Sequence, residues 1–217
     1  MKPGKLGLLG LALLLVHASA SFAAEPGFTS LFNGHDLSGW EEDTRGLWQA
    51  RDGMIVGKSP GIDYNDFLRS TKRYKDFVLQ LSFRLVNGKG NSGIQFRSMS
   101  FRRSHEISGY QADIGETYWG CLYDESRRRK VLVQATPESL STLKRDDWND
   151  YVITAVGNHI TLQLNGIQTV DYHEVDPYID QEGIIALQIH SGPPLEIQFK
   201  DIRIRELHKH PEGQGQK

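Results

Sequence analysis

Short runs in which apolar and polar side chains alternate recur along this chain, separated by Gly, Asn and Asp. The clearest run extends from Phe77 to Leu85, where Phe and Leu alternate with Val, Gln, Ser and Arg. A period of two residues is typical of a half-buried β-strand. No segment has a sustained helical stripe with capping signals. The pattern therefore predicts a mostly β protein.

Turn signals join several of these runs. Gly157-Asn158 and Asn165-Gly166 connect three runs between residues 151 and 171 into a meander. The last two runs, 184–190 and 195–205, flank a loop that contains two prolines, which cannot continue a ladder. About a dozen short strands in one domain favour a sandwich of two antiparallel sheets over a parallel α/β fold.

The first 24 residues have the composition of a secretory signal peptide. Lys2 and Lys5 precede an apolar stretch from Leu6 to Val16, which is too short to span a bilayer as a helix, and small residues follow it. We expect residues 1–24 to be a signal peptide, residues 25–207 a single β-sandwich domain and residues 208–217 a flexible tail. The mature protein would be periplasmic or secreted, with no stable membrane insertion.

Composition limits the classes of partner. Two of the 25 Lys and Arg lie in the signal peptide, which leaves 23 against 27 Asp and Glu and a formal charge of −4. This balance does not suggest a nucleic-acid partner. Cys121 is the single cysteine, so an intramolecular disulfide is excluded. The basic run 127–130 is predicted to be a solvated loop, with the lip of a groove for an anionic ligand as the alternative. The oligomeric state is not indicated.

Three predicted strands carry unusual polar residues on the face opposite their apolar side chains. Since side chains two residues apart share a face, the pattern predicts three pairs: Gln95 with Arg97, Gln111 with Asp113, and Gln188 with His190. If the strands are neighbours, these side chains form a polar floor that could bind sugar hydroxyls. Nearby rings could hold a pyranose: Tyr110, Tyr118, Trp119 and Tyr123. The alternative is the ordinary solvated face of an antiparallel sheet.

One segment invites comparison with sandwich-fold β-glucanases. The stretch from Gln111 to Glu116 resembles their Glu-x-Asp-x-x-Glu strand, but glutamine replaces the first carboxylate. A retaining glycosidase needs two carboxyl groups about 5 Å apart, and glutamine cannot form the glycosyl intermediate. No second strand carboxylate facing Asp113 is evident in the sequence. An ordinary retaining mechanism is therefore not expected.

Several motifs together resemble the 3-keto-disaccharide hydrolase family. They are FTSLFNGHDLSGW at 28–40, GNSGIQFR at 90–97, GYQADIG at 109–115, WN at 148–149, LNG at 164–166, GIIALQIH at 183–190 and FKDIRI at 199–204. The likeness covers residues 28 to 207. It implies a concanavalin A-like jelly roll, exported by a bacterium, that cleaves glycosidic bonds in sugars oxidised at carbon 3. A ketone at carbon 3 acidifies the hydrogen on carbon 2, so a base can remove it and expel the group on carbon 1.

Such a reaction needs a base, a stabiliser for the enolate and donors that orient the ring. We expect Asp113 or His190 to be the base and Arg97 the charged stabiliser. The expected substrate-binding residues are Gln95, Gln111, Gln188, Tyr110, Trp119 and Tyr123. The sequence identifies no cofactor, although a divalent metal on Asp113, Glu116 or His190 could polarise the ketone. The competing hypothesis is a noncatalytic, lectin-like domain that binds carbohydrate with the same face.

Overall fold

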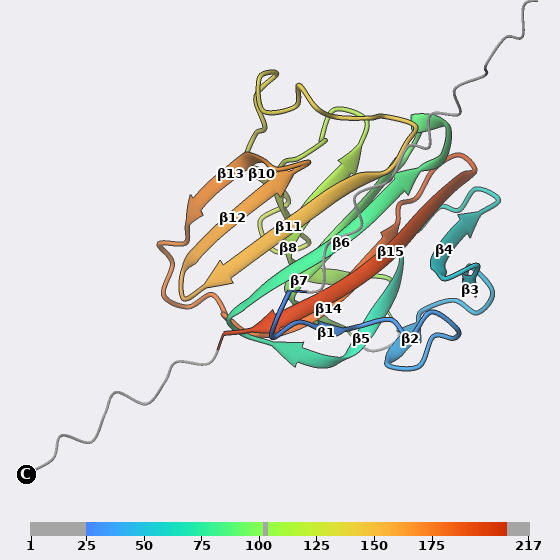
Figure 1. The fold of residues 1–217 in the computed structure, drawn as a ribbon, viewed down its shortest axis with the longest axis horizontal. Coiled ribbons are helices and arrows are strands. Elements are labelled where there is room, and N and C mark those ends of the chain that lie inside the picture. Colours follow the sequence, from blue (N-terminus) through green and yellow to red (C-terminus); the bar gives the residue numbers. More distant parts are fainter. Residues whose placement is uncertain (1–24, 102–103, 208–217) are drawn as a thin grey trace, which may run out of the picture.

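The computed structural model describes residues 25–101 and 104–207 and consists of two stacked antiparallel β-sheets, seen face-on in Figure 1. This confirms the predicted two-sheet jelly-roll sandwich. The predicted signal peptide, 1–24, and the predicted tail, 208–217, lie outside the described residues. Within the described ranges, no helix has the length and apolarity that crossing a bilayer requires.

The eight-stranded sheet has the order β13-β12-β11-β6-β15-β4-β3, with β1 paired to β15. Its strands are β1 (Thr29–Ser30), β3 (Trp48–Arg51), β4 (Met54–Ser59), β6 (Phe77–Leu85), β11 (Asn149–Val156), β12 (His159–Leu164), β13 (Ile167–His173) and β15 (Leu195–Glu206). The seven-stranded sheet has the order β10-β9-β8-β7-β14-β5-β2. Its strands are β2 (Trp40–Glu42), β5 (Asp66–Tyr74), β7 (Asn91–Ser100), β8 (Ile107–Gly115), β9 (Leu122–Glu125), β10 (Lys130–Val133) and β14 (Gly183–Ile189). A short 3₁₀ turn, Val86–Gly88, joins β6 to β7.

The core lies between the two sheets and follows the alternation in the sequence. The five Phe and Leu side chains of β6, from Phe77 to Leu85, are fully buried there. Strands of the other sheet face them with Ile94 and Phe96 from β7 and with Leu187 from β14. Fully burying one such side chain stabilises the fold by about 1.5–3 kcal/mol. The two-residue period therefore determines which face of each strand points away from the core and can contact a ligand.

Strands β8, β7 and β14 are consecutive neighbours in the seven-stranded sheet, as the polar-floor hypothesis requires. In their register, Gln95 of β7 lies opposite Gln111 of β8 and opposite Ala186 of β14. Figure 1 shows these strands behind β6, β11 and β15. Because β6, β11 and β15 cover the inner face, the outer face of β8, β7 and β14 is the one that can meet a ligand.

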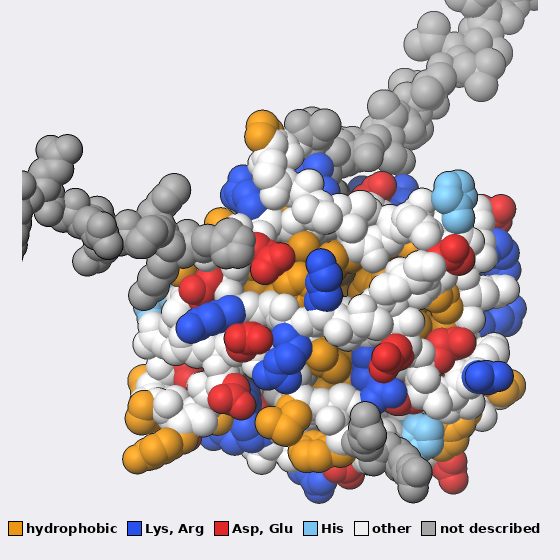
Figure 2. Space-filling model, turned by 90° about the horizontal axis from the view of Figure 1, so that it is seen from below, with side chains coloured by type: hydrophobic (Ala, Val, Ile, Leu, Met, Phe, Trp, Pro, Cys, Tyr) orange, Lys and Arg blue, Asp and Glu red, His pale blue; other side chains and the backbone are white. Residues whose placement is uncertain are grey.

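The basic run at 127–130 is not simply a solvated loop. Asp124 is fully buried and accepts hydrogen bonds from Arg127 and Arg128. Nη2 of Arg128 also forms an ion pair with Oε2 of Glu174 at 2.6 Å. Arg127 and Arg128 are thus structural, while Arg129 is exposed. Elsewhere the surface is mixed: Figure 2 shows acidic and basic side chains interspersed over one face of the molecule.

Candidate functional site

A small pocket lies on the outer face of the seven-stranded sheet. It measures about 130 Å³ and is lined by Asn91, Gln111, Asp113, Tyr118, Tyr123, Glu125 and His190. These residues come from β7, β8, β9, the loop between β8 and β9, and the end of β14. Two carboxyl groups, an imidazole, two amides and two phenol rings therefore converge on one hollow. Such a set can bind hydroxyl groups and also transfer protons.

Strand alternation explains how β8 and β9 supply the pocket. Ala112 points into the core, so its neighbours Gln111 and Asp113 point outward. On β9, the buried Leu122 and Asp124 leave Tyr123 and Glu125 on the outer face. The two strands are in register, with Gln111 opposite Tyr123.

Gly93 makes room for the pocket floor. It lies opposite Asp113 in the β7–β8 ladder. A Cβ atom at position 93 would lie only 2.5 Å from Cδ of Gln111. Because a glycine stands there, the Gln111 amide can rest over the backbone of β7 and donate to Oδ1 of Asp113, 2.6 Å away. This glycine is needed for close approach.

Asp113 is held at an almost dry position. Asp113 is only 3% exposed. This burial raises the pKa of its carboxyl group well above the usual range. The hydrogen bond from Gln111 opposes the shift, and the charge of Glu125 adds to it. The backbone is fixed as well, because the Asp113 carbonyl accepts from the Tyr151 hydroxyl of the other sheet at 2.9 Å. A carboxyl of this kind retains its proton at a higher pH than a solvated one and can act as an acid or donor.

Glu125 and His190 complete the ionisable set. Burial raises the pKa of Glu125, and the nearby His190 opposes that rise. The Nδ1 atom of His190 lies 2.7 Å from the carbonyl oxygen of Ser191. A carbonyl oxygen only accepts a hydrogen bond. When the ring is neutral, this contact places its proton on Nδ1 and leaves Nε2 with the lone pair that a base needs.

The pocket opens into a wider groove of about 510 Å³ that shares Tyr123 and Glu125 with it. Tyr64 and His105 stack there, with ring centroids 4.1 Å apart, and join two loops across the groove. Arg129 also lines this groove, which agrees with the alternative reading of the basic run. The site is thus a small polar pocket continued by a larger hollow.

Five of the residues singled out from the sequence lie together in the small pocket: Asp113, His190, Gln111, Tyr118 and Tyr123. Gln95 and Gln188 belong to the same face but are fully buried. Gln95 donates to Gln111 at 2.7 Å and thus supports the floor from below. Within the described residues, neither side-chain amide atom of Gln188 has a hydrogen-bond partner.

Arg97 lies outside the pocket, contrary to the expectation that it shares a face with Gln95. The β7–β8 ladder shifts register between Phe96 and Met99, and Arg97 has a φ of 48°. This bulge breaks the alternation. The guanidinium is buried elsewhere, 2.9 Å from Asp76 and bonded to the carbonyls of Lys75 and Gly157. Its role is therefore structural.

Tyr110 and Trp119 also lie away from the pocket. Each is 1% exposed. Tyr110 stacks on Phe96 and donates its hydroxyl proton to Glu174, while Trp119 stacks on Phe83. Both rings pack between the sheets, so neither can hold a sugar. Both residues are aromatic because large rings fill the core, not because they bind a ligand.

The sequence reasoning did not assign Asn91 and Glu125 to the site, and it treated Tyr118 only as one of several rings. Glu125 was obscured by the charged run that follows it. The signal was nevertheless present, because two-residue alternation places Glu125 on the same face as Tyr123. Asn91 begins β7 at the end of a glycine-rich turn, and its Oδ1 is buried without a partner among the described residues.

Glu125 supplies the second strand carboxylate that was not evident in the sequence. It lies opposite Gly109, whereas Asp113 is four residues further along β8. At about 3.3 Å per residue, their backbones are offset by roughly 13 Å along the strand. Retaining glycosidases hold their carboxyl groups about 5 Å apart. The register therefore disfavours a retaining pair, although two carboxyl groups line the pocket.

The suggested metal ligands are not gathered here. Glu116 is exposed and is not among the residues that line the pocket with Asp113 and His190. Among the described residues, the side chains whose ligand atoms lie close enough to share one metal ion are on β12 and β13 instead. They are His159, Asp171 and His173. The pocket fits proton transfer by side chains better than metal binding by this predicted set.

Known structures share the fold at low identity. A Parabacteroides distasonis protein named as a candidate glycosyl hydrolase is 20% identical, with a TM-score of 0.65 over 84% of this chain and 94% of its own. Carbohydrate binding module CBM66 from Bacillus subtilis is 16% identical, with a TM-score of 0.58 over 77% of this chain and 96% of its own. The Bacillus licheniformis β-glucanase is 12% identical, with a TM-score of 0.58 over 83% and 97%. No curated protein matches the sequence. The model of the 3-keto-alpha-glucoside-1,2-lyase-like domain matches residues 27–205, and the chain belongs to this family.

Proposed function

We propose that this protein is an exported enzyme that breaks the glycosidic bond of a sugar oxidised at carbon 3, by elimination across carbons 1 and 2. The observation that carries the proposal is the convergence of Asp113, Glu125 and His190 on one pocket, with the pKa of both carboxyl groups raised by burial. Three ionisable groups match the three proton-dependent events of this chemistry.

The first event is loss of the hydrogen on carbon 2. The ketone at carbon 3 makes this hydrogen acidic because the resulting charge is delocalised onto the ketone oxygen as an enolate. His190 is the base, since its Nε2 lone pair is free while Nδ1 is bonded to the Ser191 carbonyl. No nucleophile is needed, which suits a strand with Gln111 where a glucanase has glutamate.

The second event is the growth of negative charge on the ketone oxygen. Asp113 in its protonated form donates a hydrogen bond to that oxygen. Gln111 holds Oδ1 of Asp113 in place. A buried neutral carboxylic acid is an effective enolate stabiliser, because its donor is preorganised in a site from which water is excluded. This replaces the role expected of Arg97.

The third event is departure of the group on carbon 1. Glu125 lines both the small pocket and the wider groove, so it lies at the boundary between the reacting ring and the leaving group. In its protonated form it gives its proton to the departing oxygen as the C1–O bond breaks and the C1=C2 double bond forms. Water then adds its hydroxyl to carbon 1 and a proton returns to carbon 2, which completes a net hydrolysis.

The comparisons support this chemistry in part. The family is named for a 1,2-lyase acting on 3-keto-alpha-glucosides, which is the elimination described here. The CBM66 likeness favours the second candidate function, a lectin-like domain. One feature of the site also fits that candidate: the amides of Asn91 and Gln188 have buried atoms without partners among the described residues, and a bound hydroxyl could satisfy Asn91.

Turnover assays separate the two candidates. Purified protein is incubated with a 3-keto-glucoside and with the same glucoside unoxidised, and released sugar is measured. We expect release from the keto form alone, and a loss of roughly 10²–10⁴-fold in H190A. An enone intermediate absorbing in the ultraviolet should accumulate if hydration is slow. Binding of both sugars without release would support the lectin-like function and refute the enzyme.

Export is part of the proposal. The signal-like leader at 1–24 supports it, and the expected location is the periplasm or the medium. Fractionation of expressing bacteria, followed by determination of the mature N-terminus, tests this. A cytoplasmic protein that retains residue 1 would contradict it.

A further inference from the structure

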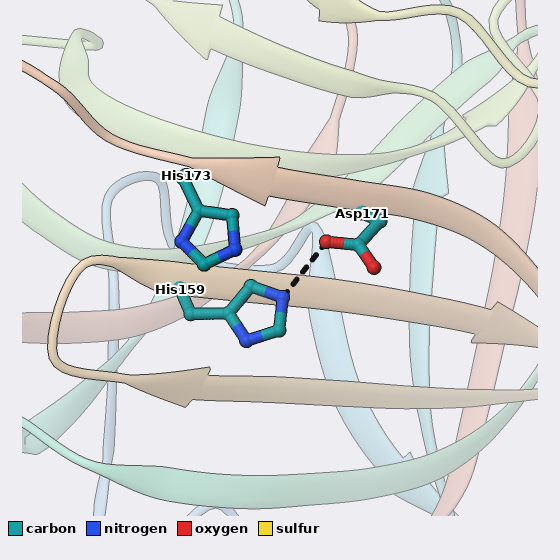
Figure 3. Close-up of side chains that lie close together, drawn as sticks. All are labelled: His159, Asp171 and His173. Atoms are coloured by element: carbon teal, nitrogen blue, oxygen red, sulfur yellow. Dashed lines mark hydrogen bonds and ion pairs between the residues drawn. The ribbon is translucent and has the colours of Figure 1, made fainter.

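Two histidines and an aspartate meet on the outer face of the eight-stranded sheet. His159 of β12 lies directly opposite His173 of β13 in the ladder, and Asp171 is two residues before His173 on the same face. Figure 3 shows the two rings one above the other, with the Asp171 carboxylate beside them. The ligand atoms of all three residues lie within 4.8 Å of one another. We propose that these three side chains form a binding site for a divalent transition-metal ion.

The donor set selects the kind of ion. Imidazole nitrogen suits Zn²⁺, Cu²⁺ and Ni²⁺, and one carboxylate beside two imidazoles leaves coordination positions for water. At Zn–N distances of 2.0–2.1 Å, tetrahedral ligand atoms are about 3.4 Å apart. Closing the present separation of up to 4.8 Å requires movements of about 1 Å. The two rings, parallel within 2° at a centroid distance of 4.1 Å, must also turn toward the ion.

The side chains are free to make that movement. Asp171 and His173 are exposed, and the His159 side chain is 41% exposed. An ion can therefore enter from solvent without opening the fold. Nε2 of His159 already lies 2.8 Å from Oδ1 of Asp171, so these two ligand atoms face one another before an ion binds.

The backbone beneath the three side chains is fixed. Next to the histidine pair, the Glu174 N–H donates to the Asn158 carbonyl at 2.8 Å, and the Asn158 amide donates to the Glu174 carbonyl at 2.9 Å. Glu174 is itself anchored by Arg128. These bonds hold β12 and β13 in register, so little backbone ordering opposes binding. Gln168 also contacts the second oxygen of Asp171 at 3.4 Å, as an outer partner of a metal ligand does.

The site is separate from the sugar pocket, which lies on the other sheet. β13 is an edge strand of the eight-stranded sheet. An ion bridging β12 and β13 would fasten this edge to its neighbour. The expected consequence is greater stability of the folded protein, because a ligand that binds only the folded state favours it.

Zinc binding to the full chain tests the proposal. Titration of metal-free protein with ZnCl₂, followed by calorimetry, should give one ion at micromolar affinity and a higher melting temperature. H173A and D171N should each weaken this affinity by more than the roughly 10–100-fold that loss of an outer partner causes. Because these side chains are exposed, both variants should keep the circular dichroism spectrum of the parent. Saturation only at millimolar zinc would overturn the proposal.

Two controls separate this site from other histidines. The exposed His35 is replaced by Ala, and in a second variant His208 and His210 are replaced by Ala. Both variants should bind zinc as the parent does. If the double variant loses the ion while H173A retains it, the C-terminal histidines are the ligands and the proposed site is refuted. Loss in H190A alone would refute it as well, because the ion would then occupy the sugar pocket.

Discussion

Replacing Asp113 by Asn should stabilise the folded protein at neutral pH while it lowers turnover. Burial raises the pKa of this carboxyl well above its usual range, so folding disfavours its charged form. Asparagine is neutral and nearly the same size. Its Oδ1 can still accept the hydrogen bond that Gln111 donates at 2.6 Å. The substitution therefore removes the charge and keeps the local contact.

The sign and size of the effect follow from proton linkage. An unfolded aspartate titrates near pH 3.9, and the folded Asp113 titrates at a higher pH. Below about pH 3.9 both states hold the proton, so parent and D113N should differ little. Between the two pKa values the unfolded chain has lost a proton that the folded chain keeps. The parent then loses about 1.4 kcal/mol of stability per pH unit relative to D113N. Above the folded pKa the difference is constant.

Urea unfolding at a series of pH values measures this difference. The free energy of unfolding of D113N minus that of the parent should rise through the acid range and then level off. The charge of Glu125 contributes to the Asp113 shift, so the difference should be smaller in an E125Q background. A difference that stays flat, or a parent that gains stability over D113N as the pH rises, would refute the buried-acid interpretation. Turnover by D113N should fall by about 10²–10³-fold.

Three further substitutions test the geometry of the sheet. G93A should displace the Gln111 amide, because the new Cβ would lie 2.5 Å from its Cδ; a cost of about 1–3 kcal/mol in urea unfolding and a lower kcat are expected. R97M should destabilise by about 3–5 kcal/mol by leaving Asp76 without its buried partner, yet the rate per folded molecule should not change. A lower rate per folded molecule in R97M would show that Arg97 does contribute to turnover. Q188M should stabilise by about 1–3 kcal/mol, since two unpaired buried amide atoms disappear; a large loss of stability would show that the amide has a partner.

The sequence predicted the fold well because alternation and turn residues act locally. The run from Phe77 to Leu85 coincides with β6, and the meander built on Gly157-Asn158 and Asn165-Gly166 is present as β11, β12 and β13. In β6, β11 and β12 one face is fully buried, so a register error would expose the whole apolar set. Local pattern and tertiary packing therefore agree.

The site was predicted less completely because two of its determinants are not local. A bulge after Phe96 turns Arg97 away from the face that carries Gln95. The alternation of residues in β7 does not predict this bulge. Tyr110 and Trp119 were predicted to bind the ligand because they are aromatic, whereas in the structure both are packed in the hydrophobic core. Glu125 was missed because a charged run conceals a strand end. Asp113, Gln111 and His190 were found because they follow the simple two-residue rule.

Two costly groups separate the outer face of β8, β7 and β14 from an ordinary solvated face. Buried polar atoms without partners also occur elsewhere among the described residues, at Asp43 and Asp66 for example, but Asp113 lines the pocket. There Asp113 is buried without a cation, and on the same face Gln188 has an unpaired amide in the described structure. Each such group costs free energy that a threonine or serine in contact with water would not. Unpaired amides alone would suit a binding site, but an uncompensated carboxyl beside an imidazole adds a cost that binding does not require. Proton transfer does require it, and this difference favours catalysis over a lectin-like role.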